Sequence, residues 1–243
     1  MSTPARQFVL VHGAWCGSWV WRDVVEQLAG LGHRAAAPTL TGLGERSHLL
    51  SDDVGLTTHV DDIVGHIEFE DLTDVDLVGW SYGGMVITGV LARIPQRIRS
   101  AFYLDAFVPT DGQSLADLSL GRSSAMAHEH EAARTPFPIR EPQYFGVTDE
   151  AVLDYCRPRL RPQPWKTMVE PVAALAEAPA HVALSYVLCR GSENPSFRAI
   201  YDRLSGDPRW TMHTLTTNHF APLTDPGGVT RLITAPGPTP TPG

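Results

Sequence analysis

The sequence predicts an α/β fold in which a mostly parallel, six-stranded sheet is flanked by helices and carries a cap inserted after the fourth strand. Short apolar runs rich in β-branched residues alternate with segments of helical spacing, which is typical of right-handed strand–helix–strand units. A glycine-rich turn joins the strand expected at 75–79 to the helix expected at 83–93. The alternation is interrupted once, by the long stretch 108–180.

The strands and helices follow from two periodicities. Residues 8–11 are short, apolar and β-branched, as in strands that are buried on both faces. The segment from Ser18 has an apolar stripe at helical spacing and ends at Gly30 or Gly32. The same patterns predict the other strands at 33–40, 75–79, 99–107, 181–189 and 210–216, and the other helices at 56–70, 83–93, 195–204 and 226–233.

The chain is expected to form one sheet domain with an insertion. Residues 1–107 and 181–235 make up the predicted core, and residues 108–180, rich in proline and aromatic side chains, make up a cap. Open α/β sheets bind ligands at the carboxyl ends of their strands, so the cap is expected to cover that edge. The Pro-rich tail 236–243 is expected to be disordered.

Composition excludes several classes of partner. The 243 residues carry 19 basic and 27 acidic side chains, a net charge of −8, and 43% of them are hydrophobic. An acidic chain without basic blocks disfavours nucleic-acid and anionic membrane partners. Three scattered cysteines and no apolar leader or spanning segment predict a cytoplasmic protein without a disulfide framework. The sequence leaves a homodimer open.

The pattern Gly79-Trp80-Ser81-Tyr82-Gly83 fits G-x-S-x-G, the turn that exposes a serine nucleophile between a strand and a helix. An unactivated serine hydroxyl is a weak nucleophile and needs a general base. His219, just after the last predicted strand, is the candidate base among ten histidines. Two backbone N–H groups that could hold an oxyanion are expected at Tyr82 and at Ala14, in the loop after the first strand.

These motifs resemble the α/β-hydrolases, and more narrowly the small esterase and hydroxynitrile lyase family that includes plant methyl-salicylate esterases and bacterial relatives. The segments VHGAWCGSWVW, LTGLGERSHL, GWSYGG and YLDAFVP carry the resemblance through the N-terminal half; the C-terminal half matches around 186–189 and at His219. The lyases of this family have a threonine where this chain has Gly13, and a lysine where it has Phe220. The resemblance therefore implies an α/β-hydrolase fold and an esterase.

The acid that should support His219 is left open. In most of this fold the acid follows the strand that ends at Cys189, and the matching position holds Ser192, which is not a carboxylate. Asp105, at the end of the fourth strand, is favoured, because some relatives carry the acid there. Glu193 is the alternative, and the absence of any functional acid is the third possibility.

The sequence thus predicts a serine hydrolase that cleaves a small carboxylic ester through an acyl-enzyme on Ser81. The expected pocket residues favour a hydrophobic, aromatic acyl group, and the family resemblance implies a small, methyl-type alcohol. The alternatives are a lyase or cofactor-free cyclase that uses Ser81 and His219 as an acid–base pair, and a non-catalytic binder. No cofactor or metal is implied. The predicted pocket residues are aromatic or apolar: Trp15, Trp80, Phe107, Met126, Tyr144, Phe145, Trp165 and Phe220.

Overall fold

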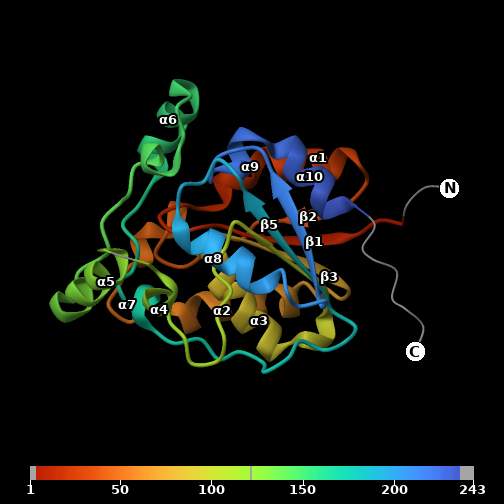
Figure 1. Ribbon diagram of the computed structural model, residues 1–243, viewed down its shortest axis with the longest axis horizontal. Coiled ribbons are helices and arrows are strands. Elements are labelled where there is room, and N and C mark those ends of the chain that lie inside the picture. Colours follow the sequence, from red (N-terminus) through yellow and green to blue (C-terminus); the bar gives the residue numbers. More distant parts are fainter. Residues whose placement is uncertain (1–3, 121, 236–243) are drawn as a thin grey trace.

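The computed structural model of the chain describes residues 4–120 and 122–235 and contains one six-stranded sheet (Figure 1). All neighbouring strands are parallel, in the order β2-β1-β3-β4-β5-β6. The predicted sheet is therefore confirmed. The strands are β1 (Gln7–Val11), β2 (Arg34–Ala36), β3 (Val75–Trp80), β4 (Ile98–Leu104), β5 (Ala183–Cys189) and β6 (Trp210–Leu215).

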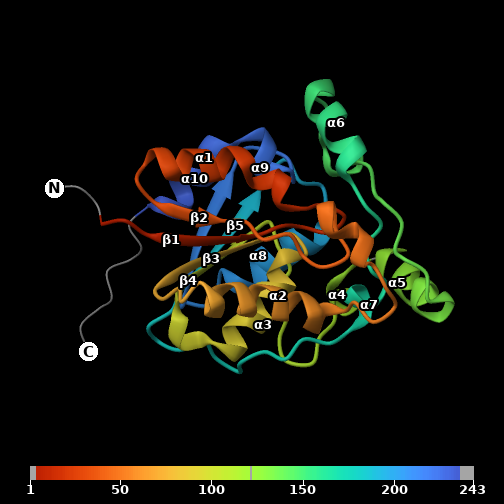
Figure 2. The same cartoon turned by 180° about the vertical axis from the view of Figure 1, so that it is seen from behind.

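Two layers of helices cover the sheet. Figure 1 and Figure 2 show α1 and α10 together on one face, and α2 and α3 on the other. The helices outside the cap are α1 (Arg22–Gly30), α2 (Leu56–Phe69), α3 (Gly83–Arg93), α8 (Pro195–Leu204), α9 (Ala221–Thr224) and α10 (Pro226–Thr234). The 3₁₀ helices η1 (Ser18–Trp21), η2 (Gly44–Leu49) and η3 (Pro95–Arg97) join them.

Two predicted elements differ from the structure. The segment 33–40 forms only the three-residue edge strand β2, because Pro38 has no N–H for a ladder and the Leu40 N–H turns away to His12 Nε2, 3.1 Å distant. The helix expected from Ser18 begins as a 3₁₀ turn and becomes α-helical only at Arg22.

The carboxyl ends of the central strands lie next to one another. Val11 of β1 pairs with Gly79 of β3, and Trp80 pairs with Leu104, which in turn pairs with Val187 of β5. The loops that follow these strands must therefore emerge at one edge of the sheet. Every residue of β3 is buried, so this central strand holds that edge rigidly.

The helical part of the segment 108–180 lies over this edge in short pieces, and its last residues run back to the start of β5 at the opposite edge (Figure 1). It contains α4 (Leu115–Leu118), α5 (Arg122–Ala133), α6 (Glu150–Cys156) and α7 (Lys166–Val169), with the 3₁₀ helices η4 (Pro142–Phe145) and η5 (Arg157–Arg159). Helices α4, α5 and α7 pack against one another to one side of the sheet, and α6 stands apart from them (Figure 1). We refer to 108–180 as the cap segment; its boundaries stay a prediction.

Two further expectations concern membrane-spanning helices and the C-terminal tail. The described residues, 4–120 and 122–235, include no helix long and apolar enough to cross a bilayer. The tail 236–243, expected to be disordered, lies outside the described residues.

Candidate active site

Ser81 lies on a tight turn between β3 and α3. Its φ of +57° is in the left-handed region, which L-residues rarely adopt outside strained turns. The turn requires glycine on both sides: a Cβ at Gly79 would lie 2.6 Å from the Gly83 carbonyl oxygen, and one at Gly83 would lie 2.6 Å from the Val11 carbonyl oxygen. The G-x-S-x-G spacing thus forms the strand–turn–helix that the sequence predicted.

The His219 imidazole lies directly beside this serine. Its Nε2 is 2.9 Å from Ser81 Oγ, although the two residues are 138 positions apart. The ring is buried and stacks on Phe197, with centroids 4.8 Å apart and planes 13° apart. The indole N–H of Trp80 donates to the His219 carbonyl oxygen at 2.7 Å. The Trp80 hydrogen bond therefore holds the backbone of His219, and the Phe197 ring holds one face of its imidazole.

Asp105 completes a hydrogen-bonded chain with these two residues. It follows β4, has a φ of +43° and is fully buried. Its Oδ2 lies 2.7 Å from His219 Nδ1, and its Oδ1 accepts from the Cys189 N–H at 3.0 Å. A carboxylate facing Nδ1 keeps the proton on that nitrogen, so Nε2 is free to accept from the Ser81 hydroxyl.

The alternative acid, Glu193, occupies a different position. Its side chain is exposed and lines the cavity wall, and the structure gives it no hydrogen bond to His219 within the described residues. Ser192, which matches the usual acid position, also lines the cavity. The loop after β5 therefore supplies cavity wall, whereas the end of β4 supplies the carboxylate next to the histidine.

Two backbone N–H groups belong to residues that line the same cavity as the reacting serine. Ala14 and Tyr82 both line the cavity that contains Ser81. Within residues 4–120 and 122–235, neither N–H donates to a protein acceptor. Buried N–H groups are normally paired, so two free ones beside a serine hydroxyl are suited to hold a developing oxyanion.

Two buried histidines near the site shape its loops. The neutral His12 ring accepts from the Leu40 N–H, which leaves Nδ1–H to donate to the Gly13 carbonyl at 2.8 Å. His59 Nδ1 lies 2.8 Å from the Tyr82 hydroxyl, and its Nε2 lies 2.8 Å from the Thr41 carbonyl oxygen. Burial lowers the pKa of both imidazoles to about 4, so both are neutral near pH 7. Burial also raises the pKa of the Tyr82 phenol.

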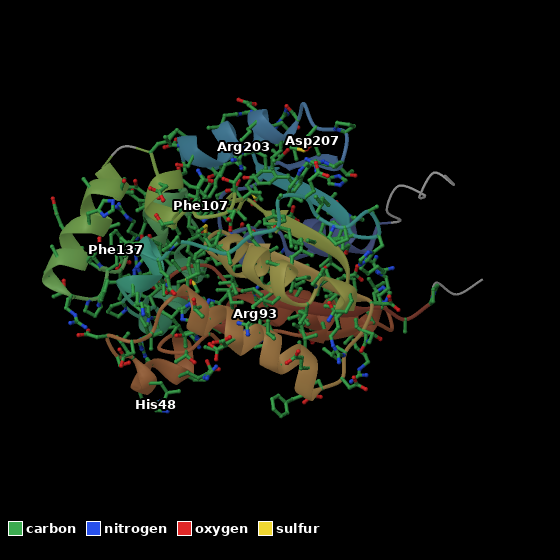
Figure 3. All side chains as sticks on the ribbon, turned by 90° about the horizontal axis from the view of Figure 1, so that it is seen from below. His48, Arg93, Phe107, Phe137, Arg203 and Asp207 are labelled. Atoms are coloured by element: carbon green, nitrogen blue, oxygen red, sulfur yellow. The ribbon has the colours of Figure 1, made fainter. Side chains whose placement is uncertain are left out.

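The cavity over Ser81 has a volume of about 450 Å³. Its wall comes from the loops of the sheet edge and from the cap segment. Figure 3 labels two wall residues, Phe107 in the loop after β4 and Phe137 beside α5. Of the eight pocket residues predicted from the sequence, four line this cavity: Trp15, Phe107, Tyr144 and Phe145.

The other four predicted pocket residues lie outside the cavity wall. Trp80 and Phe220 pack edge to face behind His219, with centroids 5.1 Å apart, because the turn at Ser81 sends the preceding side chain beneath the loop. Met126 does not line the cavity, although its sulfur lies 3.5 Å from the guanidinium of Arg140, which does. Trp165 lies at the N-terminus of α7 with Arg134 over its ring.

Sequence reasoning missed the polar part of the wall. Arg140, Gln143, Asn194 and several serines line the cavity together with apolar residues that were also missed. The cap segment has no periodic pattern that would show which side chains face inward. The missed residues are Leu115, Ser119, Leu120, Ser123, Phe137, Arg140, Gln143, Met168, Asn194, Pro195, Ser196 and Phe197.

Comparison with known proteins gives the family. The model of the alpha/beta hydrolase family matches residues 8–232. The chain belongs to this family. This alpha/beta hydrolase is 37% identical over 243 residues to the carbendazim hydrolyzing esterase of Nocardioides sp. (strain SG-4G), covering 95% of this chain and 99% of that one. It is 30% identical to methyl jasmonate esterase 1 of Vitis vinifera over 110 residues, which cover 45% of this chain and 42% of that one.

Solved structures resemble this alpha/beta hydrolase over nearly its whole length. An extracellular alpha/beta-hydrolase from Paenibacillus matches with a TM-score of 0.76 and 24% identity, covering 96% of this chain and 99% of that one. Tomato methylketone synthase I matches with a TM-score of 0.77 and 16% identity, covering 95% and 97%. At these identities the likeness shows the fold alone. The sequence relatives confirm the predicted resemblance, and the chain is an enzyme of the carboxylesterase type.

Proposed function

We propose that this alpha/beta hydrolase cleaves small carboxylic esters through an acyl-enzyme on Ser81. One observation carries the proposal: a continuous hydrogen-bonded chain from Ser81 Oγ through His219 to the buried carboxylate of Asp105. The chain opens into a cavity that also contains the two free N–H groups of Ala14 and Tyr82. Nucleophile, base, acid and oxyanion donors are the parts that acyl transfer by a serine enzyme needs.

The acylation step follows from these positions. As Ser81 Oγ attacks the ester carbonyl carbon, His219 Nε2 takes the hydroxyl proton and becomes an imidazolium beside the Asp105 carboxylate. The carbonyl oxygen takes up the negative charge and is held by the N–H groups of Ala14 and Tyr82. His219 then gives its proton to the alcohol oxygen as the carbon–oxygen bond breaks, and the alcohol leaves.

Deacylation uses the same groups in the same order. A water molecule attacks the acyl carbon while its proton passes to His219 Nε2. The tetrahedral intermediate collapses, the bond from carbon to Ser81 Oγ breaks, and His219 returns the proton to that oxygen. The products are a carboxylic acid, which carries one oxygen atom from water, and free Ser81.

The cavity supports a small substrate with an aromatic or apolar acyl group. Its volume of about 450 Å³ is in the range of small-molecule sites. The wall includes the aromatic residues Trp15, Phe107 and Phe145, and also the charged residues Arg140 and Glu193. A methyl-type alcohol is proposed from the family resemblance. The names of the relatives add carbendazim and methyl jasmonate to the compounds to be tested.

The lyase, cyclase and binder alternatives are not favoured. The lyase and cyclase alternatives were kept open by the serine at position 192, which leaves the usual acid position without a carboxylate. Asp105 supports hydrolysis, because its carboxylate lies 2.7 Å from the histidine that needs it. The relatives named as esterases support the same conclusion.

Partner and location are proposed from the composition of the sequence. The net charge of −8 supports a small-molecule partner over nucleic acid or a membrane surface. A cytoplasmic location and a homodimer are proposals from the sequence, to be tested by cell fractionation and by light scattering on the purified protein.

The deciding experiment is ester turnover in ¹⁸O-labelled water. Methyl benzoate, methyl salicylate, methyl jasmonate, carbendazim and methyl pentanoate would be tested on the wild type and on Ser81→Ala. We expect hydrolysis of at least one ester with one ¹⁸O in its acid product, and a fall in kcat of about 10⁴-fold or more in Ser81→Ala. Turnover of Ser81→Ala at the wild-type rate, or an acid product without ¹⁸O, would contradict the acyl-enzyme.

A further inference from the structure

Trp15, the residue after the proposed oxyanion donor Ala14, has an unusual backbone. Its φ of +64° lies in the left-handed region, which a bulky L-residue adopts only when its surroundings hold it there. The residue is buried, and its indole forms part of the cavity wall. Something outside the β1 loop must therefore fix this conformation.

The cap segment contacts both backbone polar groups of Trp15. The Trp15 N–H donates to Gln163 Oε1 at 2.9 Å, across 148 positions of sequence. The Trp15 carbonyl oxygen accepts from the Arg161 N–H at 2.9 Å. Arg161 and Gln163 therefore hydrogen-bond to the loop after β1 through both backbone polar groups of Trp15. We call this arrangement the Trp15 clamp.

Burial and hydrogen bonds fix the position of Gln163 itself. Its side chain is fully buried, and Nε2 donates to Thr167 Oγ1 at 2.9 Å. Its backbone exchanges two hydrogen bonds with Phe137, at 2.7 and 2.9 Å. Thr167 Oγ1 donates in turn to the Pro164 carbonyl oxygen at 2.6 Å. With every polar group engaged, the amide oxygen that faces Trp15 has a single position.

We infer that Gln163 is a positioning residue for the oxyanion site, and this inference rests on the proposed ester hydrolysis. The Trp15 N–H belongs to the peptide unit directly after Ala14. Holding that unit limits the rotation of the Ala14 amide, which lines the cavity beside Ser81. Because the Trp15 N–H is occupied by Gln163, the Ala14 N–H is the donor that this loop leaves free for an oxyanion.

The clamp also joins the cap segment to the reaction. Gln163 pairs with Phe137, a residue of the cavity wall, and with Trp15, another. The acyl-group wall and the oxyanion loop are therefore held by one buried residue, which bonds to Phe137 through its backbone and to Trp15 through its side-chain amide. A displaced Ala14 N–H stabilises the transition state less well, and this loss exceeds any loss in binding of the ester. The reason is that the full negative charge on the carbonyl oxygen is present only in the transition state.

The first test replaces Gln163 by methionine, which keeps the length of the side chain and removes both polar groups. With 4-nitrophenyl butyrate we expect kcat to fall by about 10- to 100-fold while KM changes by less than about threefold, as for a misplaced oxyanion donor. The Ki of a trifluoromethyl ketone with the same acyl chain, which forms a tetrahedral adduct, should rise in proportion to the loss of kcat/KM. Gln163→Glu keeps an oxygen for the Trp15 N–H and should recover at least about tenfold of the lost kcat.

The control for loss of a glutamine from the cap segment is Gln113→Met. Gln113 accepts from Thr110 in the first loop of the cap segment and does not line the cavity. Its kcat should stay within about twofold of the wild type, since no reacting group is displaced. Far-UV circular dichroism and the melting temperature of each variant separate misfolding from misplacement.

If Gln163→Met does not fold, the clamp is tested from its other side. Arg161→Pro removes the N–H that donates to Trp15, and Leu160 already has the extended backbone that a following proline needs. Arg161→Ala keeps that N–H and is the reference. We expect kcat for Arg161→Pro to be about tenfold below Arg161→Ala, with the same rise in Ki.

Different results would contradict the positioning role of Gln163 and the proposed ester hydrolysis. A wild type that neither hydrolyses 4-nitrophenyl butyrate nor reacts with a fluorophosphonate would overturn the proposed ester hydrolysis. An active wild type whose folded Gln163→Met variant keeps its kcat, or loses kcat without a rise in Ki, would overturn the role of Gln163 alone. Equal kcat values for Arg161→Pro and Arg161→Ala would do the same.

Discussion

Asp105 Oδ2 lies 2.7 Å from His219 Nδ1, and the carboxylate comes from the end of β4 rather than from the loop after β5. The carboxylate can come from either strand end because β4 and β5 are adjacent and parallel, so both strands end at the same edge of the sheet. The two strand ends are also joined directly: the Asp105 N–H donates to the Val187 carbonyl oxygen, and Asp105 Oδ1 accepts from the Cys189 N–H.

Replacing Asp105 by asparagine should lower kcat by about 10³- to 10⁴-fold. An amide at this position no longer holds the proton on Nδ1 or stabilises the imidazolium, so His219 no longer takes the proton from Ser81. Steady-state kinetics on the best ester of the panel measures the effect. Glu193→Gln, the matched change at the alternative acid, should lose less than about tenfold, because Glu193 lies at the cavity wall. The reverse ranking would assign the acid to Glu193.

Stability should fall as the pH is lowered from 7 to 5. Burial holds the pKa of His12 and of His59 at about 4, below the value of about 6.5 in an unfolded chain. The unfolded chain therefore binds protons first, so the stabilisation is present above pH 6.5 and is lost between 6.5 and 4. Linkage gives about 2 kcal/mol per histidine between pH 7 and pH 5.

Urea denaturation at both pH values measures this loss of unfolding free energy. His59→Gln should show a smaller loss on acidification than the wild type. His48→Gln is the control, because His48 is exposed at the edge of the molecule (Figure 3). Equal losses in all three proteins would contradict the assignment to buried histidines.

The glycines of the nucleophile turn should tolerate no side chain. A Cβ at Gly84 would lie 2.1 Å from the Phe107 carbonyl oxygen, so Gly84→Ala should destabilise the fold by at least about 2 kcal/mol. Gly65, in the interior of α2, has nothing within 4 Å of the position of its Cβ. Gly65→Ala should therefore stabilise by about 0.5–1 kcal/mol through helix propensity. Thermal unfolding of the pair checks this, and equal melting temperatures would contradict the packing argument.

Arg140 should influence which acyl groups are accepted. Its guanidinium lines the cavity and lies 4.7 Å over the Tyr144 ring, and no acidic side chain of the described residues pairs with it. Arg140→Ala should lower kcat/KM for monomethyl glutarate relative to methyl pentanoate by about tenfold, the value of a charged hydrogen bond. Glu193→Gln should move the same ratio in the opposite direction. An unchanged ratio in both variants would show that the carboxylate of the substrate does not reach this part of the wall.

The sheet and the reacting residues could be predicted because their signals are local. Buried β-branched runs mark the strands, and the glycines around Ser81 are required by contacts of 2.6 Å or less within one turn and its nearest strand. The position of His219 followed from its place after the last strand. Asp105 could be proposed from the sequence only as one of two acids, because the choice depends on which strand ends are neighbours in space.

The cavity wall and the Trp15 clamp could not be predicted in the same way. Trp15 follows β1 and Trp80 is the last residue of β3, yet Trp15 lines the cavity and Trp80 lies behind His219, because positive φ values at residues 15 and 81 redirect the chain. The cap segment has no period that would fix the direction of its side chains. Gln163 and Trp15 are 148 positions apart in the sequence, and no sequence pattern predicts that they are in contact.

An active-site label shows whether Ser81 is an activated nucleophile. The purified protein would be treated with a fluorophosphonate, and the adduct located by peptide mass spectrometry, in parallel with Ser81→Ala. We expect a single phosphonyl adduct on Ser81 in the wild type and none in the variant, since only a serine paired with a base reacts readily. An unlabelled wild type, or an adduct on another residue that persists in Ser81→Ala, would contradict it.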